Sequence, residues 1–190
     1  MKASKALSFS AAVTGVALVA ALGGCASPQK DADDQAQIET RVDESLNEFY
    51  GEASNAREVV ENAAGVLVCP RVTKAGLGVG VERGTCAMQI GGETVEYWRT
   101  SSLKGGLLAG VESHSLLMAF NTQEALDEFR SGKREWQVGA DFSVAIAKAG
   151  ATGKFDSKTM GTPVSAFVYG EAGLMYDMSL EGTTFKKLAE

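Results

Sequence analysis

The chain has 190 residues, of which 45% are hydrophobic and 22% charged, and its formal net charge is −6. These values fit one globular domain with an appended arm and exclude a chain that is disordered throughout. The acidic balance disfavours a nucleic-acid binder, because phosphate contacts need a positive surface. A zinc site of four Cys or His ligands would need all 3 cysteines and the 1 histidine, so we expect no metal site.

Residues 1–24 have the order of a bacterial lipoprotein signal peptide. Lys2 and Lys5 make a positive start, and an apolar run of about a dozen residues follows, too short for a membrane span. Leu22–Cys25 (Leu-Gly-Gly-Cys) is similar to a lipobox, in which Cys25 becomes the acylated N-terminus; an ordinary secretory signal is the alternative. No Asp follows Cys25, which is typical of outer-membrane lipoproteins with a periplasmic domain.

Residues 25–34 are short and polar and are expected to form an acylated tether. Residues 35–64 are expected to form an acidic helical arm, which Gly51 kinks or splits. Residues 31–64 carry a net charge of −8, whereas residues 65–190 sum to −1. We expect the apolar stripe of the helix to pack on the domain core; a membrane-surface helix is the alternative, but it usually has basic flanks. The stripe repeats every three or four residues and consists of Ile38, Val42, Leu46, Phe49, Ala53, Ala56, Val60 and Ala63.

Residues 65–190 are expected to form a glycine-rich core dominated by β-structure, with short apolar runs separated by glycines. The alternating stretches Phe142–Ile146 and Leu174–Leu180 predict half-buried antiparallel strands. One short internal helix is predicted over Thr122–Phe129, with Asn121 or Thr122 as its cap. The predicted fold class is α+β, with an N-terminal amphipathic helix packed on a curved, glycine-rich antiparallel sheet and one short internal helix.

No arrangement of residues in the sequence is typical of catalysis. Gly76–Gly80 lacks the third glycine of a dinucleotide loop, and no serine occupies a Gly-x-Ser-x-Gly turn. His114, between Ser113 and Ser115, is in an apparent strand, where neighbouring side chains point to opposite faces and cannot form a dyad. We therefore expect no catalytic residue, no cofactor and no enzyme activity.

Two cysteines, Cys69 and Cys86, remain once Cys25 is acylated. The oxidising periplasm permits a disulfide between them, which loop-closure entropy makes worth roughly 3 kcal/mol. The alternative is two buried apolar thiols.

Two groups of basic residues are candidates for contact with phosphate headgroups, and solvated loop charge is the alternative for both. The first group, Arg71, Lys74 and Arg83, lies near the first strand pair and is the better candidate. The second group follows the internal helix and consists of Arg130, Lys133 and Arg134.

A succession of six segments resembles the SYLF domain family, and the resemblance runs from about Val59 to Leu188. It implies a phospholipid-binding domain without catalytic residues. Eukaryotic members bind phosphoinositides and some yeast members bind actin, but actin is not an expected partner in the periplasm. The acidic helix departs from the basic helix of the eukaryotic branch. The segments are Gly65–Pro70, Val72–Gly76, Gly105–Gly110, Leu117–Phe129, Trp136–Asp141 and Gly173–Gly182.

The sequence thus predicts an outer-membrane lipoprotein with a periplasmic SYLF-like domain that binds phospholipid. Its membrane contacts would be the acyl chains on Cys25 and the surface of the domain itself. The alternative is a structural lipoprotein that docks another envelope protein, with incidental lipid affinity.

Overall fold

The structure is a computed structural model that describes residues 28–131, 135–147, 153–155, 161–170 and 179–188. The predicted signal peptide, Cys25, Lys133, Arg134 and most of the alternating stretch Leu174–Leu180 lie outside these residues. In the part of the chain that the structure describes, no helix is long and apolar enough to cross a membrane.

Helix α1 (Pro28–Glu52) begins inside the segment that was predicted to be a tether. A proline suits the first helical position because its missing N–H has no helical partner there, and acidic residues are favourable near a helix start. The helix ends just after Gly51, and α2 (Ala56–Asn62) follows. The predicted helical arm is therefore two helices, because glycine weakens a helix at the break.

The two central strands, β1 (Gly65–Ile90) and β2 (Glu93–Phe120), form one long antiparallel ribbon. They meet at a turn in which Gly91 and Gly92 have φ of 61° and 85°, a conformation that glycine adopts without strain. The short apolar runs that glycines separate in the sequence all belong to these two long strands. The glycines shift the register or bend the ribbon, but they do not end its strands.

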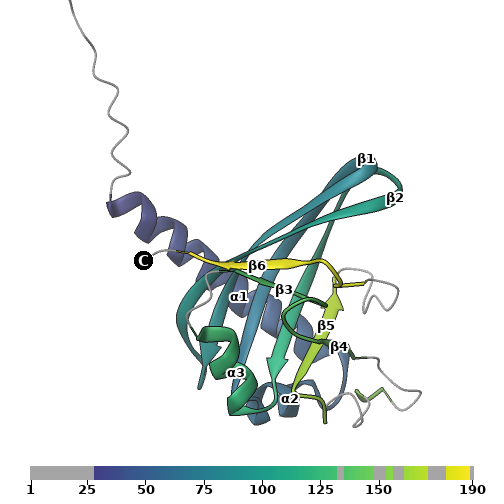
Figure 1. The fold of residues 1–190 in the computed structure, drawn as a ribbon. Helices are drawn as coiled ribbons and strands as arrows, with labels where there is room; N and C mark the ends of the chain where they lie inside the picture. The colour runs from purple at the N-terminus through teal and green to yellow at the C-terminus, as the bar shows by residue number, and fades with distance from the viewer. Residues whose placement is uncertain (1–27, 132–134, 148–152, 156–160, 171–178, 189–190) are drawn as a thin grey trace, which may run out of the picture.

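The ribbon is folded back on itself. Cys69 and Cys86 both belong to β1, yet their Cα atoms are only 4.0 Å apart, whereas an extended strand of that length would span more than about 50 Å. The reversal lies at Gly76–Gly80, because a Cβ on Gly76 would be 2.2 Å from the Val79 oxygen and Gly78 has φ +72°. β2 follows the bend, and the folded tip projects from the rest of the sheet (Figure 1).

The remaining strands join the two ends of the folded ribbon. β5 (Val164–Tyr169) pairs with the end of β2, and β4 (Ala145–Ile146) pairs with β5. β6 (Thr184–Lys187) pairs with the first part of β2, and β3 (Glu135–Gln137) pairs with β6. The β4–β5 pair is parallel, which corrects the all-antiparallel prediction; alternation along a sequence indicates faces, not strand direction.

Two smaller predictions have different outcomes. The internal helix α3 (Gln123–Arg130) has Thr122 as its cap, whose side chain accepts a hydrogen bond from the Ala125 N–H, as predicted. The predicted strand Phe142–Ile146 is reduced to β4, because Phe142 packs edge-on against Phe129 and Trp136 instead. The α+β class is confirmed.

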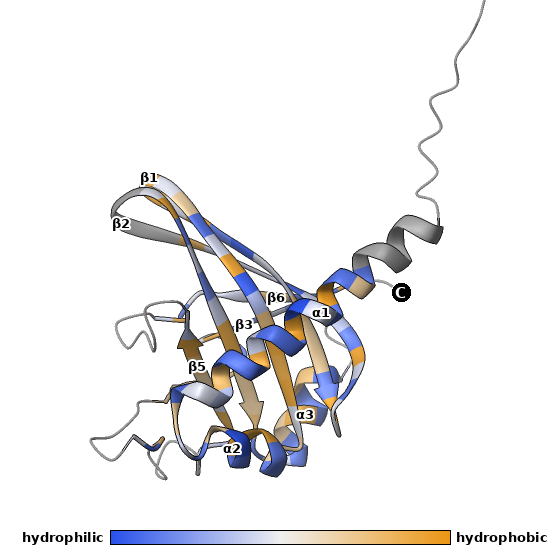
Figure 2. Cartoon of the chain, turned by 180° about the vertical axis from the view of Figure 1, so that it is seen from behind, coloured by the Kyte–Doolittle hydropathy of each residue, from blue (hydrophilic) through white to orange (hydrophobic). Residues whose placement is uncertain are grey.

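Apolar cores lie on both faces of the sheet. On the first, which we call the α1 face, Val42, Leu46 and Phe49 of α1 pack on strand residues such as Val68 and Ala87. Figure 2 shows α1 lying across this face. The Ser45 and Tyr169 hydroxyls, 2.8 Å apart, join α1 to β5. On the second, the α3 face, the core includes Leu126 and Phe129 of α3 with strand residues Leu67, Met88, Trp98 and Phe120.

Candidate functional site

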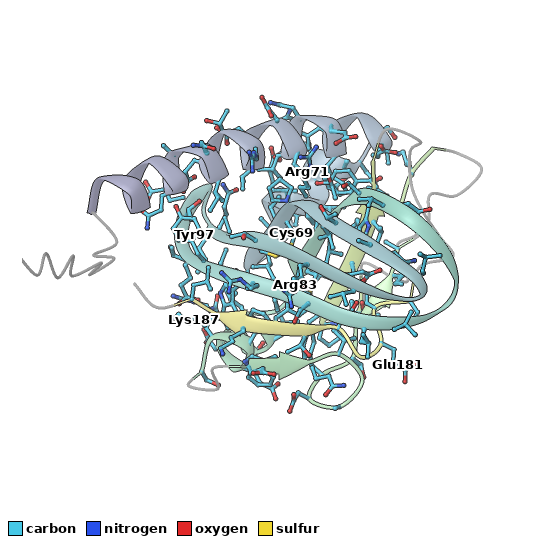
Figure 3. The ribbon with its side chains drawn as sticks, turned by 90° about the horizontal axis from the view of Figure 1, so that it is seen from above. Cys69, Arg71, Arg83, Tyr97, Glu181 and Lys187 are labelled. Carbon is cyan, nitrogen blue, oxygen red and sulfur yellow. A yellow bond between two sulfur atoms is a disulfide. The ribbon has the colours of Figure 1, made fainter. Side chains whose placement is uncertain are left out.

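Strand alternation places Arg71 and Arg83 on the α1 face. Ala87 packs beneath α1, and Thr85 and Arg83 follow at two-residue steps toward the tip. The parts of β1 before and after the bend are called here the two arms of the ribbon. On the arm before the bend, Val72 belongs to the α3-face core, so its neighbour Arg71 points to the α1 face. The disulfide between Cys69 and Cys86 holds the two arms together at this level. Figure 3 shows Arg71 between α1 and the ribbon and Arg83 on the ribbon.

The two arginines line a groove of about 340 Å³ between α1 and the folded ribbon. Arg41 of α1 and Arg99 of β2 line it as well. We call this site the arginine groove and define it by these four residues, all of which are exposed. Its other lining residues are uncharged: Ile38, Pro70, Thr73, Gly84 and Thr85.

The close approach of the two arms determines the width of the groove. A Cβ on Gly84 would lie 2.8 Å from the backbone oxygen of Arg71, so only glycine lets the second arm come this near. Any larger residue would push Arg83, its neighbour in sequence, away from Arg71.

Nearby acids offset the positive charge of the groove only in part. None of the four guanidinium groups is ion-paired with a residue that the structure describes. Glu82 is buried on the opposite side of the strand from Arg83 and accepts a hydrogen bond of 2.6 Å from Ser102. Glu39 of α1 accepts hydrogen bonds from Thr94 and Tyr97 at 3.0 and 2.5 Å. Glu82 and Glu39 therefore have uncharged partners.

The contact with Glu39 also affects Tyr97. Burial, together with the hydrogen bond to Glu39 and the negative charge of that carboxylate, raises the pKa of Tyr97 to about 12. The tyrosine consequently stays protonated at neutral pH and remains a donor to Glu39.

A second cavity, of about 640 Å³, adjoins the groove and shares Arg41, Pro70 and Arg71 with it. Its lining is mixed in charge, because Glu44 and Glu48 of α1 contribute to it. His114 also lines it, and burial lowers the pKa of this imidazole.

The serines beside His114 bind β1. Ser115 donates to the Pro70 carbonyl at 3.0 Å, and the Ser113 hydroxyl is 3.4 Å from that of Thr73. In the described part of the chain, no group of three or more His, Cys, Asp and Glu residues is arranged to hold a metal ion. The chemistry that this region supports is recognition of an anion by guanidinium groups, which bind phosphate oxygens in pairs.

The structure separates the basic residues that the sequence grouped together. Lys74, the third headgroup candidate, is one residue beyond Thr73 and so points to the other face, where its register partner is Glu112. Arg130 is also on the other side of the sheet and donates two hydrogen bonds to Glu96, at 2.9 and 3.0 Å. Neither residue lines the groove.

Sequence reasoning missed Arg41 and Arg99. Arg41 belongs to a strongly acidic helix, and no local pattern distinguishes it from surface charge. Arg99 is opposite Thr85 in the ribbon, so it points to the same face as Arg83. The register of the folded ribbon would have revealed it, but that register depends on the bend at Gly76–Gly80.

Comparison with known families identifies the C-terminal part of the chain. Residues 101–189 match the family model described as Ysc84, Las17-binding protein actin regulator. This part of the chain is similar to the Ysc84 (SYLF) domain family. The SYLF family is a lipid-binding domain family, and the match confirms the resemblance inferred from the sequence over residues 101–189. A comparison with curated proteins found no match to the chain.

The SYLF match includes α3, β3 to β6 and most of β2. All four arginines of the groove come before residue 101. The groove is therefore a feature read from this chain's own residues and geometry, and no residue role is carried over from the family.

Proposed function

We propose that this protein is an outer-membrane lipoprotein whose periplasmic SYLF domain binds anionic phospholipid headgroups in the arginine groove, without catalysis. The observation that carries the proposal is a groove with four exposed guanidinium groups and no acid in its lining. A phosphate there would gain charge-assisted hydrogen bonds and would break no ion pair among the residues that the structure describes.

The proposed anchor is Cys25, three residues before α1 begins at Pro28. Several acyl chains on one residue bind a bilayer far more firmly than one chain, at roughly 0.8 kcal/mol per buried CH₂. A domain held so close to the bilayer meets headgroups at a high effective concentration, so each groove contact can be weak.

Vesicle binding tests the domain without its anchor. The chain from residue 26 retains every described element and should be purified with its disulfide formed. We expect it to co-sediment with phosphatidylglycerol vesicles, more weakly at high salt, and to bind phosphatidylcholine vesicles poorly. Equal binding to both lipids, or to neither, contradicts the proposal.

A matched pair of variants tests the groove. Arg83→Ala removes one groove charge and should weaken vesicle binding about fivefold, the value of roughly 1 kcal/mol for a basic residue near an anionic surface. Lys74→Ala removes the same charge from the other face of the ribbon and should change binding much less. Equal losses would mean that net charge alone attracts the chain to the vesicle.

The anchor has its own test. Cells that express the full chain should incorporate labelled fatty acid into it and carry it in the outer-membrane fraction. Cys25→Ala should abolish the labelling. Labelling that persists in this variant contradicts the lipoprotein proposal but leaves the headgroup proposal standing.

A further inference from the structure

The tip of the folded ribbon exposes a group of large apolar side chains. Leu77 is 86% exposed, Leu103 72%, Val111 71% and Val79 57%. With Val81, also exposed, these residues define what we call the apolar tip. Contiguous exposed apolar surface on a folded domain marks a contact site more often than chance allows.

The two stretches of sequence that form the bend are uncharged as well. Neither Ala75–Val81 nor Gly105–Val111, which form the two strands at the bend, contains a charged residue. The bend itself requires glycine, since Gly78 has φ +72° and Gly76 has no room for a Cβ. The ribbon can therefore reverse within a narrow bend whose two stretches are aliphatic residues and glycines, with Lys104 next to them as the register partner of Gly80.

The apolar tip and the arginine groove are on the same face of the ribbon. Val79 and Val81 precede Arg83 at two-residue steps along β1, and their exposure alternates with the buried Gly80 and Glu82. Leu103 and Val81 are register partners on neighbouring strands. From α1 toward the tip, the α1 face of the ribbon is thus covered first by the helix, then lined by the arginines, and then lined by the aliphatic side chains.

The spacing between these layers suits a bilayer. Val79 is four residues beyond Arg83, about 13 Å along the strand. The headgroup layer on each side of a bilayer is about 5–7 Å thick, with the hydrocarbon below it. With this strand along the bilayer normal and the arginines on the phosphates, the leucines and valines would reach the depth of the acyl chains.

We propose that the apolar tip inserts into the acyl-chain region of a phospholipid bilayer while the arginine groove holds the headgroups above it. This inference rests on the proposed function and adds the part of the domain that penetrates the membrane. Charge complementarity selects a bilayer as the occupant, because its layers repeat the order of arginines and aliphatic side chains on this face. The paired strands of the ribbon also satisfy much of their own backbone hydrogen bonding, which entry into an apolar layer requires.

Removal of the exposed leucines tests insertion. The double variant Leu77→Ser with Leu103→Ser should weaken binding to phosphatidylglycerol vesicles at least about tenfold for each leucine. The reason is that insertion would bury most of each leucine side chain, which is exposed in the free protein. Both side chains are solvated in the free protein, so the melting temperature should stay unchanged. Val95→Ser is the control, since Val95 is also exposed but is near the opposite end of the ribbon, beside the turn at Gly91 and Gly92.

A depth measurement reads insertion directly. The native tryptophans Trp98 and Trp136 are buried, so a tryptophan introduced by Leu103→Trp would be the exposed reporter. Lipids brominated along their acyl chains should quench it and shift its emission to the blue, whereas Val95→Trp should be unaffected. Unchanged affinity of the serine variant together with an unquenched reporter overturns the insertion.

The outcomes separate the two proposals. Vesicle binding that depends on Arg83 but not on Leu77 and Leu103 overturns insertion and leaves headgroup binding intact. Loss of self-association in the serine variant, with vesicle binding unchanged, assigns the tip to a second copy of the chain and also overturns insertion. Absence of all vesicle binding overturns both proposals.

Discussion

Two basic clusters lie on opposite faces of β2 and differ in what neutralises them. On the α3 face, Arg130 and Lys187 converge on one oxygen of Glu96, at 2.9 and 2.8 Å. On the α1 face, Arg99, only three residues beyond Glu96, lines a groove without an acid. Glu96 thus forms ion pairs that stabilise the fold on one face of β2, whereas Arg99 on the other face keeps a charge that a ligand can bind. Whether a basic cluster stabilises the fold or can bind an anion therefore depends on the presence of an acidic partner, not on the basic residues themselves.

The largest expected effect comes from the disulfide, which supports the arginine groove and the fold together. Replacing both Cys69 and Cys86 by Ser should lower the free energy of unfolding by about 3 kcal/mol, because the unfolded chain regains the entropy of a 17-residue loop. The arms that carry Arg71 and Arg83 should also separate, so vesicle affinity should fall. Chemical denaturation and co-sedimentation measure the two effects. Unchanged stability, in the variant or in reduced wild-type protein, contradicts this role.

Glu96 is expected to affect stability alone. Glu96→Gln leaves Arg130 and Lys187 without their counter-charge and weakens the acceptor of the Trp98 indole N–H, 3.3 Å away. Because both cations are about one-third exposed and partly solvated, we expect a loss of about 2 kcal/mol of unfolding free energy rather than the full cost of a broken buried pair. Urea denaturation measures it, with exposed Glu93→Gln as the control. A matching loss of vesicle affinity would contradict the separation of the two clusters.

The same carboxylate predicts a pH dependence. Burial on its own raises the pKa of Glu96, but the hydrogen bonds and charges of Lys187 and Arg130 outweigh it, so the pKa is below its ordinary value. The stability that Glu96 adds is therefore fully present above the ordinary glutamate pKa and is lost as the pH falls through the lowered one. The difference in unfolding free energy between wild type and Glu96→Gln should narrow in acid. A constant difference from neutral pH to strongly acidic pH would show that ionisation of Glu96 is not its source.

The smallest expected effect is at Arg41, on the α1 side of the arginine groove. Arg41 also lines the adjoining cavity with Glu44 and Glu48, whose charges offset part of its own. Arg41→Gln should therefore weaken binding to phosphatidylglycerol vesicles only about twofold, less than the fivefold expected for Arg83→Ala. A larger loss at Arg41 would place the headgroup in the cavity beside α1.

Much of the fold could be predicted from local pattern. The apolar stripe of α1, the break at Gly51 and the cap at Thr122 are signals within a few residues of each other, and the structure contains all three features. The length of β1 and β2 could not be predicted in this way. A glycine that bends a paired ribbon and a glycine that ends a strand look alike in sequence, and only the partner strand distinguishes them.

The arginine groove was only half predictable for the same reason. Arg71 and Arg83 stood out as basic residues near one strand pair, but Lys74 was grouped with them although strand alternation sends it to the other face. Arg41 and Arg99 join the groove through contacts between segments far apart in the chain. Because such contacts follow from the folded ribbon and the placement of α1, no local pattern reports them.

The most direct test compares two charge-matched double variants in one vesicle titration. Arg71→Ala with Arg83→Ala and Arg130→Ala with Lys187→Ala each remove two positive charges, from opposite faces of the sheet. The first should weaken binding to phosphatidylglycerol vesicles at least about 25-fold with little change in stability. The second should destabilise the protein but bind as wild type does. Equal losses of vesicle affinity in the two variants would contradict the arginine groove as the headgroup site.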